Sequence, residues 1–192
     1  DLTTNNCSFT IEGEMIGFEG EVLVTVTRDG LPFLDYSNQD SPFFIDVNIE
    51  AGLYLYEVIV TWDNGTNYWE TVATIEDITC GDVFLIDGQS NSVANDYHNE
   101  NVADEGMNIF VRSFGSAVSN SNVANYSNFV IAVAEVAHAQ GSIGQWGMQL
   151  ANEIMDNQSM PILVINGAVG GTRVDQHQRN DNYPEDLNTI YG

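Results

Sequence analysis

In the first part of the chain, apolar residues alternate with polar ones in short runs. This is the pattern of strands that bury one face. Glycine-containing turn signals separate the runs, at Arg28-Asp29-Gly30 and Asp63-Asn64-Gly65. The runs predicted as strands are residues 7–11, 21–27, 43–49, 53–62 and 68–75. Several short strands with turns between them predict a small β-sandwich over residues 1–79.

Aromatic residues lie on two of these predicted strands, and they allow two interpretations. Tyr54, Tyr56, Tyr68 and Trp69 suit either a face that stacks on sugars or cross-strand pairs that stabilise a sheet. We favour cross-strand pairing, because aromatic residues on strands more often have that role. No group of catalytic residues is found in this part of the chain. The sandwich is therefore expected to be a structural or accessory domain.

After Cys80 the pattern changes to apolar runs that alternate with a segment of helical periodicity. Residues 83–86, 108–114 and 161–166 are predicted strands, and the first is apolar enough to be buried on both faces. Residues 145–157 predict a helix, with apolar positions at Trp146, Leu150, Ala151, Ile154 and Met155. Residues 116–128 are polar and predict a long surface loop. A strand, a helix and a buried strand predict a right-handed crossover and a parallel sheet.

Candidate chemistry follows the ends of two of these strands. After residues 83–86 the chain continues Asp87-Gly88-Gln89-Ser90-Asn91. A serine directly after such a strand is typical of a nucleophile at the carboxyl edge of a parallel sheet, although an ordinary polar turn has the same composition. Residues 166–172 form a glycine-rich turn, Asn-Gly-Ala-Val-Gly-Gly-Thr. Such a turn suits either an oxyanion site built from backbone N–H groups or a simple tight bend.

Charge narrows the classes of partner. The chain of 192 residues has 28 acidic residues against four basic ones, and its formal net charge is −24. The basic residues are all arginine: Arg28, Arg112, Arg173 and Arg179. Nucleic acid and anionic membrane surfaces are therefore excluded as expected partners. A dispersed acidic surface stays soluble at high salt, so a saline habitat is a fair hypothesis.

Two cysteines, Cys7 and Cys80, bear on the location of the protein. An even number of cysteines is compatible with one disulfide and an extracytoplasmic location, and the alternative is two unrelated buried thiols. The chain opens at Asp1, and we interpret it as a mature or trimmed form whose leader has been removed.

The two strand-end motifs together resemble a known family. Gly88-Gln89-Ser90-Asn91 after an apolar strand, Trp146-Gly147 at a helix start, and Gly170-Gly171-Thr172 after another strand resemble the SGNH/GDSL hydrolases. Within them, the chain is most similar to the sialate O-acetylesterase and acetylxylan esterase group of carbohydrate esterases. The resemblance covers about residues 80–192. It implies a three-layer α/β domain with a parallel sheet, an acetylated carbohydrate as substrate, and no cofactor or metal.

The resemblance also implies roles for individual residues. Ser90 would be the nucleophile that attacks an acetyl carbonyl, and its own backbone N–H would stabilise the oxyanion. Further oxyanion or substrate contacts would come from Gln89, Asn166, Gly170 and Gly171, and pocket contacts from Asn91, Thr172 and His177.

The expected general base is missing from this pattern. Relatives carry an Asp-x-x-His near the C-terminus, and this chain has none. His98 and His138 lie in other contexts, and His177 follows Asp175 by two positions, which does not match the motif. We therefore expect a C-terminal segment that carries Asp and His, either as a continuation of the chain or as a separate chain after cleavage.

The interpretation that unites these features is a secreted carbohydrate O-acetylesterase. Residues 1–79 would be an immunoglobulin-like β-sandwich, and residues 80–192 would be the N-terminal part of an SGNH-type domain. The alternative is a non-catalytic glycan-binding or surface structural protein with a degenerate SGNH domain. Hydrolysis of acetyl esters by the complete protein, and its loss on changing Ser90, would distinguish the two.

Overall fold

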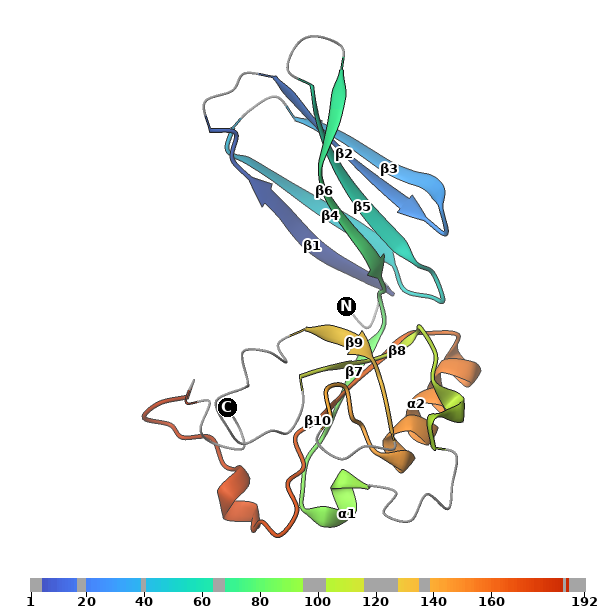
Figure 1. Ribbon diagram of the computed structural model, residues 1–192, viewed down its shortest axis with the longest axis vertical. Coiled ribbons are helices and arrows are strands. Elements are labelled where there is room, and N and C mark those ends of the chain that lie inside the picture. The colour runs from blue at the N-terminus through green and yellow to red at the C-terminus, as the bar shows by residue number, and fades with distance from the viewer. Residues whose placement is uncertain are drawn as a thin grey trace. The chain divides into compact units, whose positions relative to one another are not determined.

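The computed structural model describes residues 5–16, 20–38, 41–63, 68–94, 103–115, 128–134, 139–184 and 186. The chain is rich in sheet and has few helices (Figure 1). It divides into two compact units, Asp1–Cys80 and Gly81–Gly192.

The first unit consists of antiparallel strands in two sheets. The sheets have the orders β1-β4 and β3-β2-β5-β6. The strands are β1 (Asn6–Gly13), β2 (Glu21–Arg28), β3 (Leu31–Asn38), β4 (Phe43–Glu50), β5 (Tyr56–Asp63) and β6 (Trp69–Ile78). Alternate side chains of both sheets, such as Val24 on β2 and Val47 on β4, join one buried core. The predicted strands of this part are confirmed with shifted ends.

Two differences from the predicted strands have local causes. The strand predicted over residues 53–62 begins at Tyr56, because a tight turn in which the Tyr54 N–H donates to the Gly52 carbonyl precedes it. Strand β3 was not predicted, because Leu31-Pro32-Phe33-Leu34 does not alternate between apolar and polar residues.

A disulfide joins Cys7 on β1 to Cys80, which follows β6. Their Cα atoms are 5.8 Å apart, and Cys80 is 1% exposed. The structure therefore selects the disulfide from the two alternatives that the sequence left open. The bond ties the first strand of the unit to the end of its last strand.

The second unit is built on one mixed sheet with the order β7-β10-β8-β9. Its elements are β7 (Asp82–Ile86), α1 (Ser90–Val93), 3-10 helix η1 (Ala103–Gly106), β8 (Val111–Phe114), β9 (Phe129–Ile131), α2 (Gln145–Gln158), β10 (Ile162–Asn166) and 3-10 helix η3 (Val174–His177). β10 pairs in parallel with β7 and with β8, as the sequence predicted. β9 adds an antiparallel edge that was not predicted. Almost all of the loop predicted over residues 116–128 lies outside the described residues.

Strand β7 is not buried on both faces, so that prediction is wrong for the described part of the chain. β7 is an edge strand, and its side chains alternate between two faces. Phe84 and Ile86 pack into the core beneath α2, whereas Val83 is 62% and Leu85 71% exposed. Among the described residues, only one face of β7 is covered.

The helix predicted over residues 145–157 is confirmed as α2, and three of its five predicted apolar positions, Ala151, Ile154 and Met155, pack on the core. Gly147, Met148, Ala151 and Met155 are buried, whereas Trp146 is 42% and Leu150 39% exposed. A Cβ added to Gly147 would lie 3.0 Å from Ile86 Cδ1, so the helix approaches the sheet at its glycine. The hydrophobic pattern omitted Gly147 and Met148 from the contact face and added Trp146 and Leu150, which are partly exposed.

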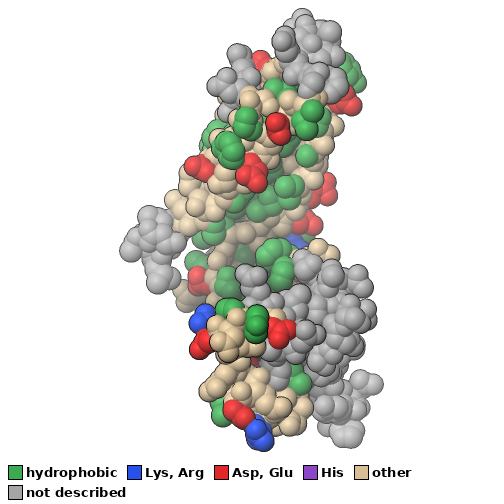
Figure 2. All heavy atoms as spheres, turned by 90° about the vertical axis from the view of Figure 1, so that its left-hand side faces the viewer, with side chains coloured by type: hydrophobic (Ala, Val, Ile, Leu, Met, Phe, Trp, Pro, Cys, Tyr) green, Lys and Arg blue, Asp and Glu red, His purple; other side chains and the backbone are tan. Residues whose placement is uncertain are grey.

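The acidic side chains lie dispersed over the face shown in Figure 2, with few basic ones among them. Some acids are paired locally; for example, Arg28 Nη1 lies 2.7 Å from Glu50 Oε2. None of the helices in the described parts of the chain is long and apolar enough to cross a membrane.

Removing the disulfide tests its contribution to the first unit. The Cys7→Ala/Cys80→Ala variant is expected to lose about 4 kcal/mol of unfolding free energy, because the unfolded chain regains the freedom of a loop whose ends are 73 residues apart. The change is measured by hydrogen exchange of the backbone amides of β2 and β5 at increasing urea concentration. Cys7→Ala alone should lose a similar amount, since either change breaks the bond. A loss below about 1 kcal/mol would contradict the assigned role.

Candidate active site

Parallel pairing of β7 with β10 brings the two strand-end motifs to one edge of the sheet. Asn166 is in register with Ile86, so the loops that follow start side by side. The pairing continues past the strands: the Gly167 N–H donates to the Ile86 carbonyl at 2.9 Å and the Val169 N–H to the Gly88 carbonyl at 3.0 Å. As a result Gly170 lies beside Ser90, where an added Cβ would be 3.9 Å from Ser90 Cβ.

Ser90 occupies the first position of the short helix α1 and is exposed. Its backbone N–H belongs to the first turn, where N–H groups have no acceptor within the helix. Its Oγ–H donates to Gln89 Oε1 at 2.6 Å. Gly88 has φ +140°, and a side chain there would collide with Ser92, so the sharp entry to α1 requires glycine. A compact turn thus presents the serine hydroxyl at the sheet edge.

Asn166, the last residue of β10, holds the loops in place through its amide. Asn166 is only 8% exposed. Its Nδ2 donates to the Ser92 carbonyl at 3.1 Å and to the Ile143 carbonyl at 3.2 Å, and its Oδ1 accepts the Ala168 N–H at 3.0 Å. Both amide hydrogens are therefore already used. The structure gives Asn166 a positioning role rather than a free donor for an oxyanion.

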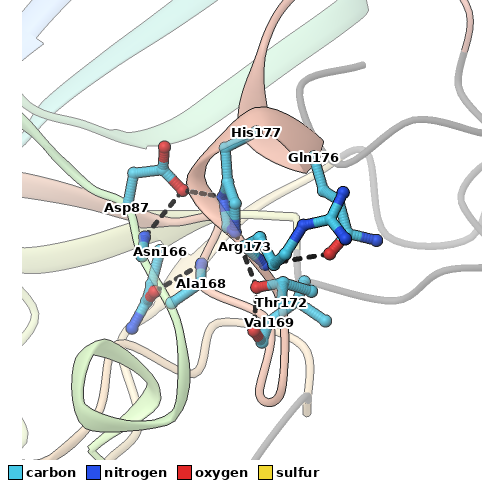
Figure 3. A network of polar contacts seen from close by, with 9 residues as sticks. Asp87, Asn166, Ala168, Val169, Thr172, Arg173, Gln176 and His177 are labelled. Carbon is cyan, nitrogen blue, oxygen red and sulfur yellow. Dashed lines mark hydrogen bonds and ion pairs between the residues drawn. The ribbon is translucent and has the colours of Figure 1, made fainter.

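His177 connects the two loops through both nitrogens of its ring (Figure 3). Its side chain is 7% exposed, and its Nδ1 lies 2.5 Å from Asp87 Oδ1. Its Nε2 lies 2.7 Å from Thr172 Oγ1, and Thr172 Oγ1 lies 2.5 Å from the Val169 carbonyl oxygen. Asp87 Oδ1 also accepts the Gly88 N–H at 2.7 Å. A chain of hydrogen bonds thus runs from the end of β7 to the glycine-rich turn after β10.

The sequence identified His177 as a pocket residue but missed its partner Asp87. The two residues are 90 positions apart, and no spacing rule joins them. The usable signal was the position of Asp87, directly after the strand that precedes Ser90. An acidic residue directly after β7 lies at the sheet edge where the Ser90 turn and the glycine-rich turn begin.

The other residues predicted for the site differ in their contacts. The Asn91 carbonyl accepts the Trp146 indole N–H at 3.1 Å, so this part of the Trp146-Gly147 motif secures the serine turn. Gly171 has φ +78° and an open surrounding. Gln89 contacts the Ser90 hydroxyl, as described above. His98 and His138 lie outside the described residues.

Positive charge near the glycine-rich turn is locally neutralised. Arg173 binds Asp175 through two hydrogen bonds of 2.9 and 2.6 Å, and Arg179 pairs with Asp181 at 2.9 Å. Hydrogen bonding from the Arg173 guanidinium lowers the pKa of Asp175 below its usual value. In the part of the chain that the structure describes, no group of three or more His, Cys, Asp or Glu side chains is arranged to hold a metal ion.

Comparisons with known protein families give no match. A search of curated proteins gives none either. The fold is similar to the crystal structure of a carbohydrate acetylesterase from Xanthomonas citri, with a TM-score of 0.47 and 17% sequence identity. The similarity covers 96% of this chain and 42% of that one, so this chain spans less than half of the length of the solved protein.

The role of Asn166 is testable by stability. Asn166→Ala leaves two carbonyls and one N–H without their partner, so the second unit is expected to lose about 2–3 kcal/mol of unfolding free energy. Hydrogen exchange of amides in β10 and α2 under urea measures the loss. Asn157→Ala is the matched control: Asn157 is exposed on α2 and bonds only within its helix, so a change within about 0.5 kcal/mol is expected. Equal effects of the two variants would contradict the role.

Proposed function

We propose that this chain is part of a carbohydrate O-acetylesterase in which Ser90 is the nucleophile. The observation that carries the proposal is the exposed Ser90 hydroxyl at the carboxyl end of β7, with the Gly170 turn of β10 beside it. A nucleophile and backbone N–H groups at one edge are what acyl transfer requires. The Gly88-Gln89-Ser90-Asn91 and Gly170-Gly171-Thr172 motifs point to the sialate O-acetylesterase and acetylxylan esterase type.

The proposed reaction has two steps. Ser90 Oγ attacks the acetyl carbonyl, and the tetrahedral oxyanion accepts hydrogen bonds from the N–H groups of Ser90 and of Gly170 or Gly171. Collapse of this intermediate breaks the ester bond, and the sugar oxygen leaves with a proton from the general acid. Water then attacks the acetyl-serine and releases acetate, so that Ser90 is regenerated.

The general base must take the proton of Ser90 during the first step. Gln89 Oε1 orients the hydroxyl but, as a neutral amide, does not take up its proton. Both nitrogens of His177 are engaged, by Asp87 and Thr172. The proposal therefore keeps the base that the family resemblance implies: an Asp and a His from a C-terminal segment, supplied as a continuation or as a cleaved companion chain.

The proposal extends to the whole protein. The first unit would be an immunoglobulin-like accessory sandwich and the second the N-terminal part of a three-layer SGNH-type domain. Secretion is supported by the Cys7–Cys80 disulfide, since such bonds persist in oxidising compartments. The net charge of −24 supports a saline environment.

Ester hydrolysis and covalent trapping test the nucleophile. The full-length protein is incubated with acetylated xylo-oligosaccharides or O-acetylated sialic acid, and released acetate is measured. Ser90→Ala is expected to lower turnover by at least about a thousandfold, because the attacking oxygen is removed. A fluorophosphonate should label the wild type at one site, located by peptide mapping to Ser90. Ser92→Ala, two positions away on α1, should keep labelling and turnover.

Three outcomes decide between the esterase proposal and the glycan-binding alternative. Turnover that persists in Ser90→Ala contradicts the nucleophile assignment. Full-length protein that binds acetylated glycan without releasing acetate supports the glycan-binding alternative. Turnover that appears only when a segment carrying Asp and His is present supports the proposed source of the base.

A further inference from the structure

We propose that Asp87, His177 and Thr172 form a proton-dependent latch that orients the Gly170 N–H, with His177 as its positioning residue. The link to catalysis rests on the proposed function, whereas the latch itself follows from the hydrogen bonds of the described residues. The residues of the latch are shown in Figure 3.

The number of protons in the network decides which contacts form. Three contacts run in series: Asp87 Oδ1 to His177 Nδ1, His177 Nε2 to Thr172 Oγ1, and Thr172 Oγ1 to the Val169 carbonyl. Each contact needs one proton. The Val169 carbonyl has none to give, and the Thr172 hydroxyl has one. The Asp87–His177 pair must therefore supply two protons for all three contacts to be hydrogen bonds at once.

The two protonation states differ at Thr172. With two protons in the pair, as in an imidazolium beside a carboxylate, Nε2–H donates to Thr172 Oγ1 and the Thr172 hydroxyl donates to the Val169 carbonyl. With one proton in the pair, it stays between Nδ1 and Asp87, and Nε2 becomes an acceptor. The Thr172 hydroxyl then turns to Nε2 and releases the Val169 carbonyl. Histidine is suited to this change because its charge normally changes between pH 5 and 8.

The released carbonyl belongs to the peptide group that carries the proposed oxyanion donor. The Val169 C=O and the Gly170 N–H share one planar trans peptide, so fixing the carbonyl fixes the direction of the N–H. On the other side, the Val169 N–H donates to the Gly88 carbonyl, a bond that contains none of the protons of the Asp87–His177 pair. Because Gly170 lies beside Ser90, the latch sets the direction of the Gly170 N–H relative to the proposed nucleophile.

The charged groups around His177 favour Asp87 as its controlling partner. Among the described residues, the neighbouring charges on its own short helix and beside it are Arg173 and Asp175, which bind each other, and Arg179, which binds Asp181. Asp87 comes from the residue after β7 and is the acid in direct contact with the imidazole. The described surroundings thus leave the Asp87–His177 contact as the one ionic interaction of this ring.

Nuclear magnetic resonance of the full chain tests the latch without requiring turnover. Histidine side-chain nitrogens and the Gly170 and Gly171 amides are followed between pH 4 and about 9, a range that brackets histidine titration. In the wild type, both glycine amides should shift with the midpoint of the His177 ring, and His177→Asn assigns the ring signals. In Thr172→Val the ring should still titrate while the glycine amides no longer follow it. Thr172→Ser, which keeps the hydroxyl, should restore the coupling.

Asp175→Asn is the matched control, because it removes an acid from the same short helix without a contact to the ring; the coupling should persist. Glycine amides that stay constant in the wild type, or that follow the ring equally in Thr172→Val, would overturn the latch. A Nε2–H tautomer at high pH that is unchanged by Asp87→Asn would overturn it as well.

Kinetics of the full-length protein test the link to catalysis. Thr172→Val should lower kcat about tenfold with KM little changed, because a misdirected donor weakens only transition-state binding. Thr172→Ser should restore kcat. If turnover is absent in every form while the glycine amides follow the ring as described, the proposed function fails and the latch stands. If turnover depends on Ser90 but not on the Thr172 hydroxyl, the latch fails as a catalytic device.

Discussion

The parallel pairing of β7 with β10 is the interaction on which the rest of the site depends. Each strand ends at the same edge, and the register of Asn166 with Ile86 sets the loops one against the other. Hydrogen bonds from Gly167 and Val169 to the β7 side extend the pairing into the loops. Residues far apart in the sequence, such as Ser90 and Gly170, therefore meet at one edge of the sheet. The position of Ser90 beside Gly170 is a consequence of this register.

The sequence predicted those elements whose signal is local. Apolar runs located β7 and β10, and the helical period located α2, because burial imposes these patterns on neighbouring residues. The prediction from sequence failed at residues whose burial depends on the tertiary arrangement of the strands and helices. The apolar residues of β7 predicted two buried faces, yet Val83 and Leu85 are exposed at an edge. On α2, a glycine marks the contact face, which a hydrophobic pattern does not detect.

The site divides in the same way. Ser90, Gly170 and Gly171 were predicted because each lies in a short motif after a strand. Asp87 and its bond to His177 were not, because a contact across 90 residues leaves no trace in spacing. Asn166 was predicted to contact the oxyanion or the substrate, whereas its amide bonds to two carbonyls and one N–H, and composition does not tell these two settings apart. Hydrogen-bond partners, unlike strand positions, follow only from the folded chain.

Two different side chains hold the two loops, and their chemistry differs in one respect. Asn166 holds the serine turn through a neutral amide that does not titrate, and its bond to the Ser92 carbonyl involves no ionisable group. The turn that carries Gly170 is held through an imidazole, whose two ring nitrogens contact Asp87 and Thr172. In the proposed latch, the protons of the Asp87–His177 pair decide the direction of the Gly170 N–H, whereas the bonds of the Asn166 amide contain none of these protons. Under the proposed function, the latch would orient a donor for the oxyanion, while Asn166 would hold the turn that carries Ser90.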